Sequence, residues 1–370
     1  MSKPIYVSYS SASKFKSCPS KYYLGKRYET RLIGSAFGFG KAVESGVEAL
    51  LLGKSLEDSC EIFVKKWEIE DERGTPRPIF DNLAVEYYAS DFDENLLDST
   101  AQAQIQEWAD ELLPDSKDKH WKETFDEVNT QMKTDESQLD ENEMLFNNRV
   151  IWMCCLIRGQ VMIQAFHDKL LPKLTLLEIN GKPATQIETN IKNDQGDTIP
   201  GFIDFLVKHV DISDPIIIDL KTGANPYDMH TLDTSDQLRT YVAAKGAEFN
   251  TRRAGYIVLV KKIKTHKSCN VCGQMRDGGS AKNCKSTKDC KGQYLIPSLE
   301  SDVQFINKEF NDNILEDVLN DYENIMVAIK NNVNFKNTKS CNEYNKKCEF
   351  YDHCWKGTPL EKIEHLKERK

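Results

Sequence analysis

Two carboxylates and one lysine lie in two short apolar segments that predict neighbouring β-strands. Asp204 is embedded in Gly-Phe-Ile-Asp-Phe-Leu-Val, and Asp219 follows three isoleucines and precedes Lys221 by two positions. Residues two apart on a strand point to the same face, so Asp219 and Lys221 share a face. If the connecting turn closes symmetrically around Ile212 and Ser213, Lys221 lies opposite Asp204, and the three side chains form one cluster.

Such a cluster suits metal-assisted hydrolysis of phosphodiester bonds. Carboxylates are hard oxygen ligands of the kind that Mg²⁺ or Mn²⁺ takes. The metal polarises a phosphate and lowers the pKa of a bound water, and a nearby lysine orients that water or neutralises developing charge. One Asp-x-Lys on a strand is also typical of a plain solvated face. Two carboxylates within apolar runs, however, are costly to bury unless a cation compensates them.

The surrounding pattern predicts the elements that must hold these residues. In chain order they are a helix over 144–171, an alternating strand at 184–192, strands at 201–210 and 216–221 joined by the turn DISDP, a helix over 234–249 and a strand at 254–262. This order predicts an α/β fold with a mixed sheet flanked by helices.

The rest of the chain divides into segments that differ in composition and hydrophobic pattern. A serine-capped helix with a Cys-Pro break is expected over 9–28, a Gly-rich turn and then a helix over 33–53, a strand near 293–297 and a helix over 311–332. The expected organisation is an N-terminal part of the core (1–54), an acidic helical insertion (55–150), the catalytic core (151–264), a zinc-ribbon-like insertion (265–292) and a C-terminal helix with a cysteine cluster (293–370).

The overall composition narrows the range of binding partners and cellular compartments that we expect. The chain has 370 residues, a net charge of −9 and 11 cysteines. No stretch is expected to reach the length of a membrane span, and the start MSKPIYVSYS has no apolar signal region, so we expect a cytoplasmic protein without a membrane partner. Clustered cysteines in a reducing compartment indicate metal rather than disulfides. The acidic balance argues weakly against nucleic acid but does not decide it.

Taken together, the motifs resemble the catalytic region of RecB-type PD-(D/E)XK nucleases, which include the AddAB nuclease domains, the CRISPR adaptation nuclease and many phage exonucleases. The stretch GFIDFLV, then IIIDLKTG, then SDQLRTYVAA follows that family's pattern, and SSASKFKSCPSKYYL resembles its amino-terminal segment. The resemblance implies a restriction-endonuclease-like fold and a DNA exonuclease that acts on single-stranded DNA or DNA ends in recombination, repair or replication, in the host cytoplasm if phage-encoded. The matching residues are Gly201, Asp204, Asp219, Lys221, Thr222, Gly223, Gln237 and Tyr241.

The same resemblance implies a role for each site residue. Asp204 and Asp219 would bind the metal, and Lys221 would be the catalytic lysine. Gln237 and Tyr241 lie one helical turn apart and would position the nucleic-acid backbone or the ligand carboxylates. An ordinary surface glutamine and a packed tyrosine are the alternative for that pair.

Two glutamates are further candidate metal ligands. Glu44 follows the Gly-rich segment at the position where the family often has histidine, which is a departure from its pattern. Glu188 lies on the strand before the hairpin. For Glu188, a solvated strand face is the simpler interpretation.

Four closely spaced cysteines predict a structural zinc site. Cys269-x-x-Cys272 is followed by Cys284 and Cys290, and this spacing is typical of a closed tetrahedral ribbon or knuckle. Unligated thiols are the alternative. A contact with DNA by this insertion is a further possibility that its lysines leave open.

A second cysteine set resembles the [4Fe–4S] ligands of iron–sulfur RecB-type nucleases. In those proteins one amino-terminal cysteine and three near the carboxy terminus hold a cluster that cross-links the domain. Here the corresponding residues are Cys18, Cys341, Cys348 and Cys354, with a longer gap than usual between Cys341 and Cys348. A second zinc and buried free thiols are the alternatives.

Two non-catalytic functions stay open from the sequence. One is a nuclease-like fold that holds DNA or a partner without cutting, although the intact Asp204, Asp219 and Lys221 argue against it. The other is a metal-bearing scaffold in a replication or recombination complex, with the acidic insertion docking a protein partner.

Overall fold

The computed structural model describes residues 3–30, 35–70, 76–78, 96–116, 119–135, 139–269, 271–272, 274–277, 284, 290–343, 346–363 and 366–369 of the chain. Parts of the two expected insertions therefore lie outside the described residues, namely 71–75, 79–95, 117–118 and 136–138 of the first, and 270, 273, 278–283 and 285–289 of the second.

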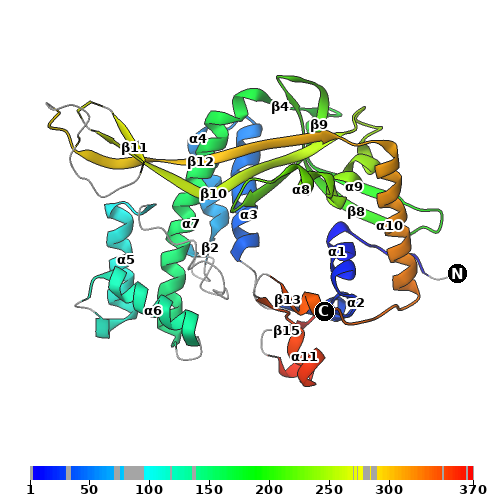
Figure 1. Cartoon of the computed structure of the whole chain (residues 1–370), viewed down its shortest axis with the longest axis horizontal. Coiled ribbons are helices and arrows are strands. Elements are labelled where there is room, and N and C mark those ends of the chain that lie inside the picture. Colours follow the sequence, from blue (N-terminus) through cyan, green and yellow to red (C-terminus); the bar gives the residue numbers. More distant parts are fainter. Residues whose placement is uncertain are drawn as a thin grey trace.

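A mixed β-sheet forms the centre of the molecule (Figure 1). Its strand order is β12–β10–β9–β8, with β11 also pairing β10 and with β4 and β7 pairing the outer edge of β8. Among the described strands of this sheet, only β9 and β10 pair in parallel, and helices connect them. The strands are β4 (Leu174–Leu176), β7 (Thr185–Lys192), β8 (Thr198–His209), β9 (Ile212–Gly223), β10 (Arg253–Cys269), β11 (Met275–Asp277) and β12 (Tyr294–Glu309). The expected α/β fold with a mixed sheet is confirmed.

Helices cover both faces of the sheet, which explains the run of three isoleucines in β9. Ile216 and Ile218 pack on the side of α7, whereas Ile217 packs on the side of α9. A strand buried on both faces has no polar face to alternate with. The helices on the side of α7 are α3 (Ser35–Leu51), α4 (Leu56–Trp67), α5 (Ser99–Leu112), α6 (Trp121–Asp135) and α7 itself (Glu141–Lys169). The helices outside this group are α8 (Met229–Asp233), α9 (Asp236–Lys245) and α10 (Asp312–Lys330).

Helix α7 is the longest of the described helices and is capped as its sequence requires. Asp140 accepts a hydrogen bond from the Glu143 backbone, and the Glu143 side chain accepts one in return from the Asp140 backbone. By length and composition, residues 141–173 are long and apolar enough to cross a membrane, contrary to the expectation from the sequence. Of its most apolar window, 61% is buried inside the protein, and a buried core helix passes the same test.

The expected position of the turn between β8 and β9 is wrong. The β8–β9 turn is Val210–Asp211 rather than DISDP, because β9 already begins at Ile212, paired with His209. The register therefore differs by two residues from the symmetric one, and a shift of two leaves every side chain on its original face.

The Gly-rich segment expected as a turn is the first part of α3, which begins at Ser35. A glycine inside a helix costs about 1 kcal/mol relative to alanine. Between Gly38 and Gly40, however, Phe39 is almost completely buried against Phe63 and Trp67. This tertiary packing outweighs the local preference.

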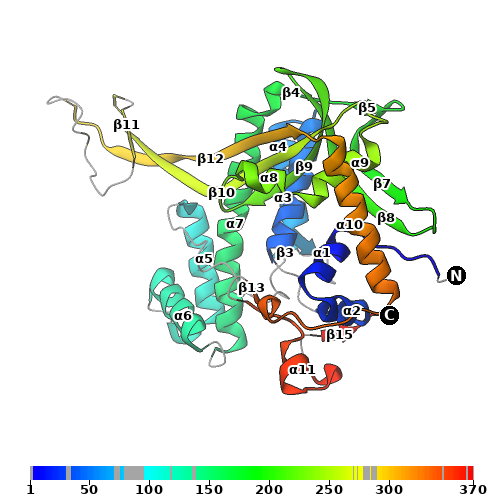
Figure 2. The same cartoon turned by 45° about the vertical axis from the view of Figure 1, so that its right-hand side comes forward.

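Segments near the two ends of the chain pair beside the core, where Figure 2 shows α2 and β15 close together. The expected break at Cys18 separates α1 (Tyr9–Ser17), capped by Ser8, from α2 (Pro19–Arg27). Strand β1 (Tyr28–Thr30) pairs with β15 (Leu366–Glu368). The remaining short elements are β2 (Glu68–Glu70), β3 (Pro76–Pro78), β5 (Glu178–Ile179), β6 (Lys182–Pro183), β13 (Asn342–Glu343), β14 (Lys346–Lys347) and α11 (Tyr351–Lys356).

Candidate active site

The predicted site residues line a cleft of about 560 Å³ where β8 and β9 approach α9, α3 and the start of α1. This volume lies within the range of roughly 300–1,000 Å³ that is typical of ligand sites. The cleft contains Asp204, Asp219, Lys221, Gln237, Tyr241 and Glu44 together. Its other lining residues are Ser8, Tyr9, Ser10, Gly40, Lys41, Gln186, Pro200, Gly201, Phe202, Leu220, Thr222 and Thr240.

Asp219 forms the floor of the cleft and is paired with the lysine of its own strand. Its side chain is almost completely buried, and Oδ2 lies 2.6 Å from Nζ of Lys221. Burial raises the pKa of Asp219, and the charge of Lys221 opposes this. Burial disfavours the charged form of Lys221, but Asp219 outweighs it and raises the pKa of Lys221. Lys221 therefore remains an ammonium that faces the cleft.

Gln237 and Tyr241 hold this pair from α9. Gln237 donates from Nε2 to Oδ1 of Asp219 (2.7 Å) and to the Tyr241 hydroxyl (2.8 Å), while its Oε1 accepts from Lys221 Nζ (3.2 Å). Ser235 caps α9 and fixes where this helix starts. Gly201 gives the neighbouring strand room, because a Cβ there would lie 2.8 Å from Thr189 Oγ1. The amide thus orients the carboxylate, the ammonium and the phenol at once.

Asp204 lies beside Asp219 on the neighbouring strand. Its Oδ2 accepts a hydrogen bond from the backbone N–H of Leu220 over 2.8 Å. Burial raises the pKa of Asp204 to about 7, and the negative charges of Asp219 and Glu44 add to the effect. Three carboxylates thus influence one another within the cleft, and a cation bound between them would relieve the repulsion.

Glu44 reaches the cleft from α3, far away in the sequence. Its carboxylate accepts hydrogen bonds from Lys41 Nζ (2.9 Å) and from Gln186 Nε2 (2.8 Å). Glu188 does not join it: this residue is exposed on β7, opposite Phe202, and does not line the cleft. The structure therefore brings one of the two candidate glutamates to the aspartates and leaves the other on the solvent side.

Gln186 is a residue of this site that the sequence did not reveal. It lies on β7 with a φ of 48°, in the left-handed region that few residues other than glycine adopt. Such strain persists where surrounding structure enforces it, often at functional sites. No spacing rule marks a strand glutamine as a neighbour of a glutamate 142 positions earlier.

The carboxylates fit a magnesium or manganese ion rather than a closed protein cage. Among the described residues, only the four cysteines discussed below place three or more ligand atoms within 4.8 Å of one another. Mg²⁺ usually keeps several waters and binds through one or two carboxylates and a substrate phosphate. Asp204 and Asp219 meet that need, with Glu44 nearby.

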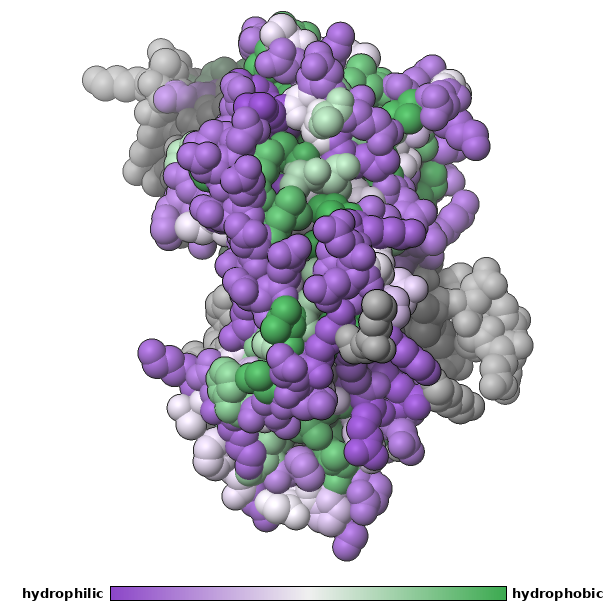
Figure 3. All heavy atoms as spheres, turned by 90° about the vertical axis from the view of Figure 1, so that its right-hand side faces the viewer, coloured by the Kyte–Doolittle hydropathy of each residue, from purple (hydrophilic) through white to green (hydrophobic). Residues whose placement is uncertain are grey.

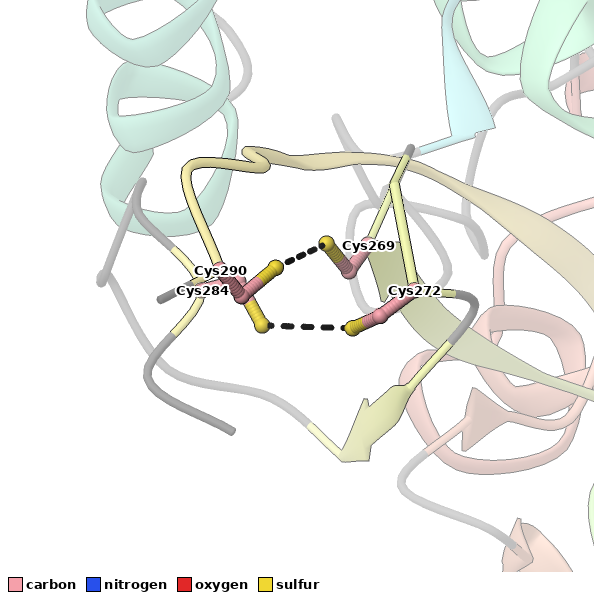
Figure 4. A group of neighbouring side chains, drawn as sticks. All are labelled: Cys269, Cys272, Cys284 and Cys290. Carbon is pink, nitrogen blue, oxygen red and sulfur yellow. Dashed lines mark hydrogen bonds between the residues drawn. The ribbon is translucent and has the colours of Figure 1, made fainter. Parts of the chain in front are cut away.

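The first cysteine set forms a compact group at the far end of the long β10–β12 arm, away from α1 and α10 (Figures 1 and 2). The sulfur atoms point toward one another (Figure 4), at 3.6 Å between Cys269 and Cys290 and 3.7 Å between Cys272 and Cys284. A tetrahedral zinc with bonds of about 2.3 Å requires sulfur atoms roughly 3.8 Å apart. The group can therefore hold one such ion.

The second cysteine set lies where segments near the two ends of the chain pair. The Cys18 sulfur accepts from the Asn337 backbone N–H at 3.5 Å, and the Cys341 sulfur lies 3.6 Å from the Asn337 carbonyl oxygen. The Cys348 backbone N–H donates to the Cys341 carbonyl. Burial raises the pKa of the Cys354 thiol, and negative charge on Cys18 and Cys341 adds to this rise. Among the described residues, the sulfurs of this second set do not form a group within 4.8 Å of one another, unlike those of the first set.

The core runs strand, strand, strand, helix, strand, and its neighbouring strands β8 and β9 bring two aspartates and a lysine into one cleft. This combination of fold and residues is typical of the PD-(D/E)XK class of proteins. The chain belongs to the PD-(D/E)XK nuclease superfamily, whose family model matches residues 6–355, nearly the whole chain. The fold is accordingly restriction-endonuclease-like, and the protein is a nuclease by family, with DNA as the implied substrate and divalent metals as the cofactors of its relatives. A search of curated proteins gave no match.

Proposed function

We propose that this protein is a deoxyribonuclease that uses Mg²⁺ or Mn²⁺ to hydrolyse DNA phosphodiester bonds. The observation that carries the proposal is the buried Asp219 tied to Lys221 and Gln237, with Asp204 beside it, in one open cleft. Asp204 and Asp219 would hold the metal, with Glu44 as a further ligand. When bound, the metal would polarise the scissile phosphate and supply an activated water.

The protein's own groups would do the positioning. The Lys221 ammonium stays charged, so it would orient the attacking water and offset negative charge that develops on the phosphate. Gln237 keeps that ammonium and the Asp219 carboxylate in fixed relation. The Tyr241 hydroxyl, held by Gln237, would contact the DNA backbone.

Exonuclease action on DNA ends, in recombination, repair or replication, is the finer part of the proposal. It is supported by the likeness of the Gly-x-Ile-Asp, Asp-x-Lys-Thr-Gly and Gln-x-x-x-Tyr motifs to those of RecB-type members. We also propose structural zinc at Cys269, Cys272, Cys284 and Cys290, and a [4Fe–4S] cluster at Cys18, Cys341, Cys348 and Cys354. Both would be structural rather than hydrolytic.

The test is cleavage of end-labelled and circular DNA, single- and double-stranded, by anaerobically purified protein with Mg²⁺, Mn²⁺ or EDTA. Lys221→Ala should reduce metal-dependent cutting by roughly two to three orders of magnitude. Lys245→Ala is the matched control, because this lysine pairs with Glu248 on the surface, outside the cleft. Sparing of circles would support an exonuclease.

A folded, metal-loaded wild type that cuts none of these DNAs would overturn the proposal. The alternative would then be a DNA-binding or partner-binding scaffold on the same fold. Equal loss of cutting in Lys221→Ala and Lys245→Ala would also count against the assigned role of Lys221.

A further inference from the structure

Some of the exposed aromatic side chains lie at the cleft. Among the described residues, the exposed aromatics are Tyr6, Tyr9, Phe202, Phe335 and Trp355. Two of these, Tyr9 and Phe202, line the cleft itself. Phe202 is 56% exposed and Tyr6 is 71% exposed. Leaving large apolar surface in water is unfavourable by about 25 cal/mol per Å², so such a grouping next to an active site points to a ligand.

Backbone pairing explains how Tyr6 joins the other two. The N–H of Val7 donates to the Thr198 carbonyl, and the N–H of Thr198 donates to the Ile5 carbonyl, both at 2.9 Å. The segment before α1 is therefore bonded to the start of β8. Val7 is completely buried, so Tyr6, next to it on an extended segment, points to solvent.

The same two segments carry the other aromatics toward the cleft. Phe202 lies four residues after Thr198 on β8, roughly 13 Å along the strand. Tyr9 is the first residue of α1 and lies near Lys221, whose positive charge acts on its hydroxyl. Tyr9 and Phe202 therefore flank the cleft that contains Lys221, and Tyr6 is bridged to the same strand four residues before Phe202.

The amino-terminal segment also differs in charge from the rest of the chain. Residues 1–28 contain no Asp or Glu, although the whole chain carries a net charge of −9. Ion pairs engage Lys16 with Asp236 and Asp321, and Lys21 with Glu349. Figure 3 shows the face that lies on the right-hand side of Figure 1, and this face is mostly hydrophilic, with small hydrophobic patches. The basic residues of the segment are Lys3, Lys14, Lys16, Lys21, Lys26 and Arg27.

Aromatic rings beside a locally basic segment are what proteins use to hold single-stranded nucleic acid. Bases stack on the rings regardless of sequence, and lysines follow the phosphates. A base inside a duplex has both faces covered by its neighbours and cannot stack on a protein ring. The buried position of Asp219 also requires the scissile phosphate to enter the cleft rather than rest on its rim.

We propose that Tyr6, Tyr9 and Phe202 form a stacking platform for unpaired bases, which delivers a single DNA strand to the cleft. This inference rests on the proposed nuclease function and deepens it by naming the substrate as single-stranded DNA. The platform recognises nucleobases as a class and not a sequence.

Fluorescence anisotropy in EDTA tests the platform without cleavage. The probes are a labelled oligothymidylate, an abasic oligomer of the same length and a blunt duplex. Wild type should bind the oligothymidylate most tightly. Phe202→Ala and Tyr6→Ala should each weaken that binding by about fivefold or more, as expected for loss of one stacked base. Neither should change binding to the abasic oligomer.

Phe335→Ala is the matched control, because Phe335 is also 56% exposed and does not line the cleft. It should bind all three probes like wild type, and all three variants should melt at the wild-type temperature. Equal weakening on the oligothymidylate and the abasic oligomer, no weakening at all, or tighter binding of the duplex would overturn the platform.

The outcome is separable from the proposed function. Base-dependent binding by a protein that cuts no DNA would support the platform and overturn the nuclease. Metal-dependent cutting without base-dependent binding would leave the nuclease standing and overturn the platform alone.

Discussion

Gln237 donates a hydrogen bond from Nε2 to the Oδ1 atom of Asp219 over 2.7 Å, and this bond ties helix α9 to the buried carboxylate of the Asp-x-Lys motif. The same side chain accepts from Lys221 and donates to Tyr241. One amide therefore fixes three groups of the site, and it does so from a different element of secondary structure.

Gln237→Ala should lower both stability and activity. It leaves Oδ1 of a buried carboxylate without this donor, which costs about 1–3 kcal/mol. Tyr241→Phe removes only the hydroxyl at the end of the network and should cost about 1 kcal/mol. Urea unfolding and cleavage rates measure both. Equal effects of the two variants would contradict the central place of Gln237.

Stability without metal should fall as the pH rises through 7. The folded-state pKa of Asp204 is raised to about 7, above its ordinary value of 3.8, so the protonated acid stabilises the fold at low pH. That contribution is complete below the unfolded pKa and is lost as the pH passes the folded one. From pH 6 to pH 8 in EDTA, the loss is about 1 kcal/mol.

Metal should reverse this dependence, because its ligands must be deprotonated. Mg²⁺ or Mn²⁺ should bind more tightly at pH 8 than at pH 6 and restore the melting temperature. Asp204→Asn, which cannot titrate at this position, is the comparison. A wild type whose metal-free stability is flat between pH 6 and pH 8, like that of Asp204→Asn, would refute the raised pKa.

Gln186→Gly should separate stability from metal affinity. Glycine accepts the φ of 48° without strain, which favours the fold by about 1 kcal/mol. The change also removes the amide that donates to Glu44, so metal affinity should fall several-fold. Isothermal titration with Mn²⁺ and thermal melting report the two effects. Gln186→Ala keeps the strain and should show only the loss of affinity.

Removal of the proposed zinc should affect the arm and not the core. Cys284→Ser should remove one equivalent of zinc by metal analysis, because a tetrahedral site needs all four thiolates. Hydrogen exchange should rise in β11 and at the end of β10 and stay unchanged in β8 and β9. Retention of one zinc in the variant would contradict the four-cysteine site.

The second cysteine set should bind iron. Anaerobically purified wild type should contain iron and acid-labile sulfide, and Cys348→Ser should lose both while it keeps its zinc. Cys60→Ser is the control, because Cys60 packs against the α-helical core away from both sets. Zinc in place of iron in wild type would show instead that a second zinc occupies this site.

Several features followed from the sequence because they depend on near neighbours in the chain. The period of two on a strand gives Asp219 and Lys221 one face, and one helical turn brings Gln237 next to Tyr241. The break at Cys18 is equally local. The spacing of Cys269 and Cys272 likewise indicates a metal group.

Other features depended on contacts between distant segments, which no local period encodes. The sequence placed the β8–β9 turn two residues too far along, because its hydrophobic pattern is compatible with either register. The sequence offered both Glu44 and Glu188 as candidate ligands, with a solvated face as the simpler interpretation for Glu188, and the packing of α3 against β9 brings Glu44 to the aspartates. The strained Gln186 and the aromatic rings that flank the cleft had no signal in the sequence at all. The residue types and their local order thus determined the chemistry, whereas the tertiary structure decided which residues share the cleft, because that depends on how non-neighbouring elements pack.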